Sequence, residues 1–181
     1  MSTLPVFDNP AVLPGSHYLD VSTARRAVDL ASPLIEAGLR DRALIGSGFL
    51  HVVIMDPGRP PGQAAFEDAI LHEQAFAASN DAPDADYAAF ARSKAHTSWR
   101  LGTDSGSIQA TSPHLLRVGD SLLAGGICRN GLVVGVSGAF PHYDEVYALT
   151  LIAFLQALAH AARLAEDDRP ILGAKESSSV G

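Results

Sequence analysis

Hydrophobic and polar positions along the chain predict alternating helices and strands. A first helix begins near Ser22 or Thr23, which are good capping residue types. Its apolar side follows helical spacing, with Ala24, Ala27, Val28, Ala31, Leu34, Ile35 and Gly38 in phase. Residues 49–55 form a short apolar run with β-branched members, which is typical of a buried strand. A second strand is predicted within residues 66–76.

The second half of the chain repeats this alternation. A second helix is predicted over residues 86–100 and a third strand around residues 115–118. Residues 122–136 read as a hairpin, because Asn130-Gly131 supplies the positive φ angles that a tight turn needs. The last helix, over residues 143–164, is apolar nearly all round and is therefore predicted to be largely buried.

This order of elements indicates an antiparallel sheet flanked by helices, an α+β domain. Residues 1–20 contain several prolines without periodicity and are expected to form an irregular N-terminal arm. Residues 21–165 form a single domain. Residues 166–181 are charged and then rich in serine and glycine, so we expect a flexible C-terminal tail.

Composition narrows the class of protein. The 181 residues carry a net charge of −7, which argues against a general binder of nucleic acid or of anionic membranes. One cysteine excludes an internal disulfide and a cysteine-rich zinc site. No apolar run reaches the ~20 residues that span a bilayer, and no positive charge precedes an apolar core at the N-terminus. We expect a cytoplasmic protein.

Lysine is scarce, since 11 of the 13 basic residues are arginine. Lys175 falls in the predicted tail, so Lys94 is the lysine of the domain. Helical spacing places it inside the apolar stripe of the second helix. An ammonium group there must snorkel, form an ion pair or lose its charge. Lys94 is therefore either a packed, paired residue or a functional one, an anchor for an anion or a general base.

Other candidate groups have equally plain structural explanations. Glycines inside the hairpin indicate a turn, close packing or a ligand approaching the backbone. Asp144, at the start of the last helix, suits the helix dipole, and free N–H groups at that end bind anions. The seven histidines include no pair with i, i+4 spacing, so a metal site of sequence-local ligands is not expected. A single histidine can still be an axial haem ligand.

Several short motifs, in this order and spacing, resemble the GlcG/HbpS-like superfamily over about residues 20–163. They are Lys94-Ala95-His96-Thr97, Gly125-Gly126, Val133-Val134-Gly135-Val136-Ser137-Gly138 and Asp144-Glu145. The resemblance implies a profilin-like three-layer α/β/α fold with a five-stranded antiparallel sheet. It also implies a homo-oligomer, a dimer or larger. Members of this superfamily include haem-binding proteins, and others lack a settled activity, so fold is shared more securely than function.

One hypothesis that follows is a small-molecule-binding protein for haem or another planar, anionic ligand. The resemblance implies that the ligand lies against the second helix. The ligand-binding candidates are Lys94, Thr97, Gly125, Gly126, Ser137 and Asp144. The candidates for an axial haem ligand are His72, His96 and His142.

The alternative is a small cofactor-independent enzyme that moves a proton on a carboxylated or carbonyl substrate, as an isomerase or lyase does. Lys94 is then the general base or an electrostatic clamp, and Ser137 or Thr97 polarises the carbonyl. A structural or interaction subunit fits the composition equally well. The sequence shows no complete catalytic constellation.

Overall fold

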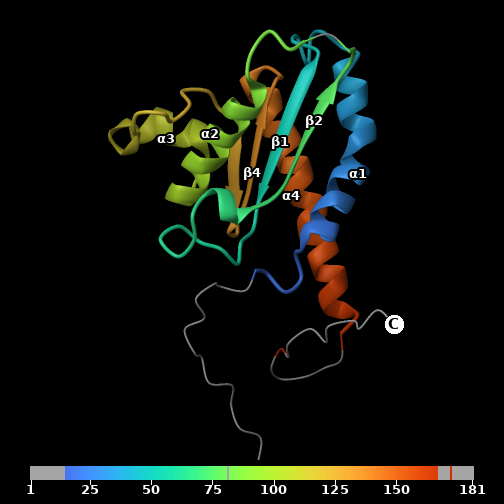
Figure 1. The fold of residues 1–181 in the computed structure, drawn as a ribbon, viewed down its shortest axis with the longest axis vertical. Coiled ribbons are helices and arrows are strands. Elements are labelled where there is room, and N and C mark those ends of the chain that lie inside the picture. Colours follow the sequence, from blue (N-terminus) through green and yellow to red (C-terminus); the bar gives the residue numbers. More distant parts are fainter. Residues whose placement is uncertain (1–14, 81, 167–171, 173–181) are drawn as a thin grey trace, which may run out of the picture.

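The computed structural model describes residues 15–80, 82–166 and 172, in which helices cover both faces of one antiparallel sheet (Figure 1). In chain order the elements are α1 (Val21–Leu39), β1 (Phe49–Met55), η1 (Glu67–Ala69), β2 (Ile70–Ala77), α2 (Tyr87–Leu101), α3 (Ser105–Thr111), η2 (Pro113–Leu115), β3 (Gly126–Arg129), β4 (Leu132–Ser137) and α4 (Pro141–Leu164).

The predicted terminal segments fall largely outside the described residues. This applies to residues 1–14 of the arm and, in the tail, to residues 167–171 and 173–181, which include Lys175. The described end of the arm contacts the domain: the Asp56 carboxylate accepts a hydrogen bond from the Ser16 N–H at 3.0 Å. The first helix begins two residues earlier than predicted, because Asp20 caps it by accepting from the Thr23 N–H.

The sheet has the strand order β2-β1-β4-β3, and every neighbouring pair is antiparallel. The predicted hairpin is confirmed as β3 and β4, with Arg129 opposite Leu132. Its turn has φ angles of 52° at Asn130 and 81° at Gly131, the conformations that Asn-Gly adopts at low cost. The fold is therefore mixed α+β with an antiparallel sheet, as predicted.

The sheet has four strands in the described residues, where five were expected. Residues 115–118 were predicted to form a strand, and this is wrong. Their backbone groups are used locally: the Leu116 N–H donates to Pro113 O, and the Arg117 N–H donates to the Asp120 carboxylate. A segment that bonds within its own turns has no free groups for a neighbouring strand. The profilin-like layering stays a prediction.

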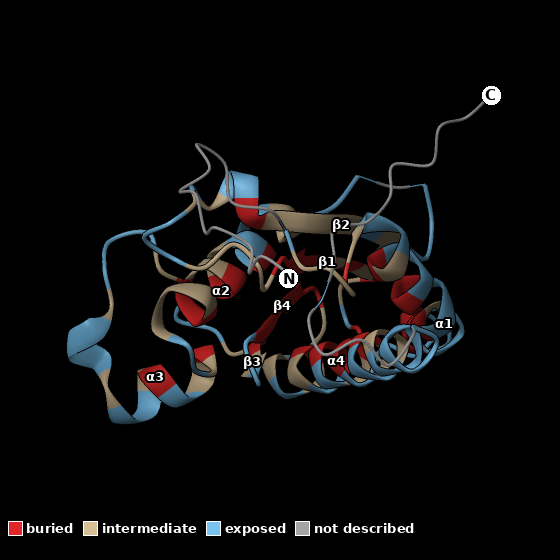
Figure 2. Ribbon diagram, turned by 90° about the horizontal axis from the view of Figure 1, so that it is seen from below, coloured by how far each residue is buried: buried red, intermediate tan, exposed pale blue. Residues whose placement is uncertain are grey.

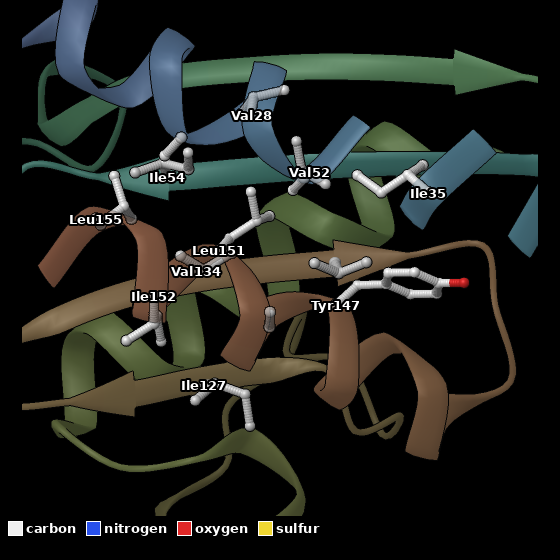
Figure 3. Close-up of a cluster of buried hydrophobic side chains, with 14 of the residues drawn as sticks. Val28, Ile35, Val52, Ile54, Ile127, Val134, Tyr147, Leu151, Ile152 and Leu155 are labelled. Carbon is white, nitrogen blue, oxygen red and sulfur yellow. The ribbon is translucent and has the colours of Figure 1, made fainter. Parts of the chain in front are cut away.

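The main hydrophobic core lies between the sheet and the helices α1 and α4 (Figure 3). Alternation along β1 sends Leu50, Val52 and Ile54 to this side. A smaller core lies on the other face, where Val53 and Met55 of β1 pack against α2. The two faces of the central strand are thus both covered.

The last helix is less buried than its composition predicts. α4 buries one side against the sheet and α1, while Val146 and Leu149 on its outer side are 48% and 40% exposed (Figure 2). By length and composition it could cross a membrane, and 28% of its most apolar stretch is buried. Since apolar helix surfaces are usually buried, we expect the outer side of α4 to contact another molecule.

Candidate functional site

Lys94 and Asp144 form an ion pair in the interior of the protein. The Lys94 Nζ lies 2.7 Å from Asp144 Oδ2, and each side chain is 1% exposed. The same ammonium donates to Val136 O at 3.0 Å and lies 3.2 Å from Ser137 Oγ. The other carboxylate oxygen of Asp144 accepts from the Ala139 N–H at 2.9 Å. The sequence motifs of helix α2, strand β4 and helix α4 therefore meet at one point.

These contacts show which partners the Lys94 ammonium has. An ammonium has three N–H donors, and the three oxygen atoms around it use all of them. The structure shows the paired, packed residue, and no donor is left for an external anion. Both carboxylate oxygens of Asp144 also have partners within the protein. One accepts from the Lys94 ammonium and the other from the Ala139 N–H.

Burial raises the pKa of Asp144 from 3.8 to about 7, although the Lys94 ammonium and the Ala139 N–H act in the opposite direction. A carboxylate loses hydration when it leaves water, and that loss favours the protonated acid. The pair therefore joins two helices at an electrostatic cost. Such a pair is weak evidence for a stabilising role, although loss of one partner leaves the other buried without its countercharge.

Glycines allow this close approach. A Cβ atom at Gly126 would collide with Lys94 O, and one at Gly135 would collide with Ala91 O, so α2 can lie directly on the hairpin only because both residues lack side chains. Gly125 has a φ of 126°, and its added Cβ would lie 2.8 Å from Asp144 Cβ. Of the three interpretations of the hairpin glycines, close packing accounts for Gly126 and Gly135.

Thr97 lies on the same helix but belongs to a different group. Its hydroxyl oxygen is 3.0 Å from both Ser93 O and Asp120 Oδ1. Asp120 also accepts from Arg100 at 2.6 Å and from the Arg117 N–H at 2.7 Å. Thr97 therefore ties the loop before β3 to helix α2, away from Lys94.

The three histidines expected as haem ligands lie apart from one another. His72 contacts Gln74 on β2, with its Nε2 3.4 Å from Gln74 Oε1. His96 is 38% exposed near the end of α2 and packs edge-on against Phe66. His142 stacks on Phe140 at the start of α4. No group of three or more metal-ligating side chains exists among the residues that the structure describes.

A cavity of about 500 Å³ has a lining that includes neither Lys94 nor Asp144. It is lined by Phe49, Leu50, His51, Ala75, Phe76, Pro83, Ala85, Asp86, Tyr87 and Ala88. Its walls are the start of β1, the end of β2 and the first turn of α2. The volume and the mainly apolar lining are those of a small-molecule site.

His51 connects the cavity to the buried pair. It lies opposite Ser137 in the register of β1 and β4, so the two side chains share the face that α2 covers. The sequence interpretation did not single out His51. Phe49 and His51 alternate with buried residues along one strand, which places both on the same side of the sheet. This alternation does not show which segment forms the other wall of the cavity.

Burial lowers the pKa of His51, because the charged imidazolium would lose hydration; the Glu73 carboxylate acts in the opposite direction. The His51 Nε2 lies 3.6 Å from Glu73 Oε2 and has no hydrogen-bond partner in the described structure. Glu73 is itself held by Arg92, whose Nε donates at 2.9 Å. A neutral imidazole can give one hydrogen bond to a ligand without adding charge.

Solved structures with a similar fold place the chain among known proteins. A double mutant of HbpS from Streptomyces reticuli is 23% identical, has a TM-score of 0.51, and is matched over 84% of this chain and 97% of that one. Protein ORFY of Klebsiella pneumoniae, a DUF336-family protein, is 14% identical with a TM-score of 0.51, over 86% and 99%. This is the GlcG/HbpS-like fold.

A complex of PduOC with haem is also similar, at 18% identity and a TM-score of 0.45, over 79% of this chain and 95% of that one. No protein-family model matches the chain, and no curated protein gives a significant match. At these identities the GlcG/HbpS-like similarity establishes the architecture. The ligand has to be argued from the residues of the cavity.

Proposed function

We propose that the protein binds a small planar molecule in the cavity beside β1, β2 and the first turn of α2. The observation that carries the proposal is the lining of this cavity, where Phe49 and Tyr87 border about 500 Å³ of space next to His51. The rings of Phe49 and Tyr87 are nearly parallel, 16° apart, with centroids separated by 6.2 Å. Flat, mainly apolar walls with a few polar groups suit a flat ligand.

Two neighbouring alanines give a direct test. Ala88 lines the cavity, while Ala89, the next residue of α2, is exposed and does not. We expect the neutral planar dye Nile red to bind the wild-type protein with a saturable rise in fluorescence. Ala88→Trp fills the cavity and should weaken binding at least tenfold, whereas Ala89→Trp should leave it unchanged. Equal binding by both variants would place the dye elsewhere and refute the proposal.

Haem is the ligand that the family resemblance implies, and the residues of the cavity do not fit it well. Its apolar face would find the aromatic rings. Its two carboxylates would find no cation among the lining residues, and the Nε2 of His51 is turned toward Glu73. Haem binding through His72, His96 or His142 is therefore a separate proposal, since none of them lines the cavity. A haemin titration that gives a saturable Soret shift, lost in one His→Ala variant, would support it.

The enzyme hypothesis also stays a proposal, with His51 added to the candidates for proton transfer. Lys94 stays a candidate base, and its ammonium would have to leave Val136 O, Ser137 Oγ or Asp144 Oδ2 to act on a ligand. Ser137 remains on the face shared with His51, so a proton transfer in the cavity would use His51 first. A cytoplasmic location is likewise a prediction that the fold does not test.

Self-association is a second proposal, and the outer side of α4 favours it. No charged residue occurs from position 146 to position 162, although that side of the helix is open, with Val146 and Leu149 exposed. A second copy of the chain would cover this apolar strip. Sedimentation velocity should show a dimer or larger for the wild type and a monomer for Leu149→Glu. The control is Leu122→Glu, a change at a 73% exposed loop residue; liposome binding instead of self-association would contradict the proposal.

A further inference from the structure

The charges around the cavity determine which planar molecules it accepts. Asp86 is among the lining residues, and Asp84 lies beside it, where it accepts a hydrogen bond from the Tyr87 hydroxyl at 2.7 Å. Both acidic residues are exposed, so they lie at the open rim. Among the residues that the structure describes, no lysine or arginine lines the cavity.

Two cations of α2, the helix whose first turn lines the cavity, are already engaged. Arg92 donates to Glu73 through both its Nε and one terminal nitrogen, and Lys94 is paired with Asp144. The amino end of α2 also opens at the cavity and would attract an anion. That end is occupied, because the Asp86 carboxylate accepts from the Ala89 N–H at 2.9 Å. An anionic ligand would therefore meet a carboxylate at the rim with no positive partner.

The remaining polar group inside is His51, which burial keeps in its neutral form. A neutral imidazole carries one acceptor nitrogen beside its N–H donor, so it can accept a hydrogen bond from a ligand and adds no positive charge. The rings of Phe49 and Tyr87 attract a cation to their faces and are indifferent to an uncharged ligand. The aromatic walls, the neutral imidazole and the acidic rim thus all favour a cationic or neutral ligand over an anionic one.

We propose that the cavity selects a planar aromatic molecule that carries a cationic or neutral hydrogen-bond donor, such as an amine or hydroxyl, and disfavours an aromatic carboxylate. This inference rests on the proposed function, since it names the class of ligand for the same cavity. It also reverses the sequence-based expectation of an anionic ligand, which depended on Lys94 being free to bind it.

Three indoles with the same ring and different side-chain charge make the test. Tryptamine is a cation, tryptophol is neutral and indole-3-acetate is an anion at pH 7. Each is used to displace Nile red from the full-length protein. We expect tryptamine to displace the dye at a concentration at least fivefold lower than indole-3-acetate, with tryptophol between them.

Asp86→Asn keeps the helix cap, because asparagine caps as well as aspartate, and removes the charge at the rim. It should reduce the ratio between tryptamine and indole-3-acetate to less than twofold. Asp29→Asn, a change at an exposed residue of α1, should leave the ratio unchanged.

The outcomes separate this inference from the proposed function. If indole-3-acetate competes as well as tryptamine, or if none of the three displaces a dye whose binding Ala88→Trp abolishes, the ligand class is wrong and the cavity is still a binding site. If Ala88→Trp leaves Nile red binding intact, the proposed function fails and this inference fails with it.

Discussion

Lys94 Nζ and Asp144 Oδ2 are 2.7 Å apart and join two helices that lie on opposite faces of the same sheet. The contact is possible at the end of β4, where the chain leaves the sheet and turns into α4. Glycine at position 125 leaves room for both side chains there. The pair fixes α2 and α4 relative to each other, and α2 in turn forms one wall of the cavity. The geometry of the proposed binding site therefore depends on an interaction that no ligand touches.

Lys94→Met should destabilise the protein, and the cost should grow as the pH rises. Removal of the ammonium leaves Asp144 buried without its countercharge, so a pKa that is already raised to about 7 rises further. A carboxyl group with a raised pKa contributes stability at low pH and loses it as the pH rises through the folded-state value. We expect a loss of roughly 3–5 kcal/mol in the free energy of unfolding at pH 8, and a smaller loss at pH 5. Urea denaturation at both pH values measures it.

The matched control is the exposed ion pair between Arg92 and Glu73, whose side chains are 46% and 31% exposed. Arg92→Met removes a cation of similar length from the same helix, and the expected cost is below about 1 kcal/mol because water and salt screen such pairs. Equal costs for the two methionine variants would show that burial of the Lys94 pair has no energetic consequence.

Asp144 should also give the wild type a pH dependence that Asp144→Asn lacks. The folded-state pKa of about 7 lies above the ordinary value of 3.8. The folded protein therefore binds the proton more tightly than the unfolded chain does, and stability falls from about pH 4 to about pH 7. Relative to the asparagine variant, the wild type should lose unfolding free energy across this range and change little above pH 8. A constant difference between the two from pH 4 to pH 8 would contradict the raised pKa.

Much of this arrangement could be predicted from the sequence because its signals are local. Helical spacing placed Lys94 inside an apolar stripe, and Asn130-Gly131 specified the hairpin that brings Gly125 and Ser137 to it. The choice between a functional and a paired lysine could not be made locally. It depends on Asp144, which lies 50 positions further along the chain and reaches Lys94 only through the sheet.

The parts that were missed depend on contacts between distant segments. The short helix η2 and the loop after it stand where the third strand was predicted, and Asp120 of that loop accepts hydrogen bonds from Thr97 and Arg100 of α2. The cavity is closed by residues around Pro83 and by the first turn of α2, whereas His51 belongs to β1. The periodicity of a sequence indicates which side of a strand is buried. It does not indicate where the packing on that side leaves a cavity.

Gly126→Ala should destabilise the protein by forcing α2 away from the hairpin. A Cβ atom there would collide with Lys94 O and would lie 2.6 Å from Ser98 Oγ, and a backbone atom in a packed helix cannot move aside alone. We expect a loss of about 1–3 kcal/mol, the range for overpacked cores, and weaker dye binding, since the moved helix lines the cavity. The control is Gly46→Ala, where the added atom meets Phe140 at an ordinary 3.4 Å. Similar losses for both alanines would exclude close packing as the reason for Gly126.

Asp120→Ala should destabilise the loop before β3 at neutral pH and much less in acid. Burial acts to raise the pKa of Asp120, but hydrogen bonds from the Arg117 N–H and the Thr97 hydroxyl outweigh it and hold the pKa below its usual value. A depressed carboxyl pKa gives stability that is present above the unfolded value, near 4, and is lost as the pH falls through the folded one. The charged hydrogen bond from Arg100 adds to this. We expect a cost of about 2–3 kcal/mol at pH 7 that shrinks toward pH 2.5, measured by urea denaturation, with Asp29→Ala as the exposed control. An equal cost at both pH values would mean that Asp120 acts through its shape and not through its charge.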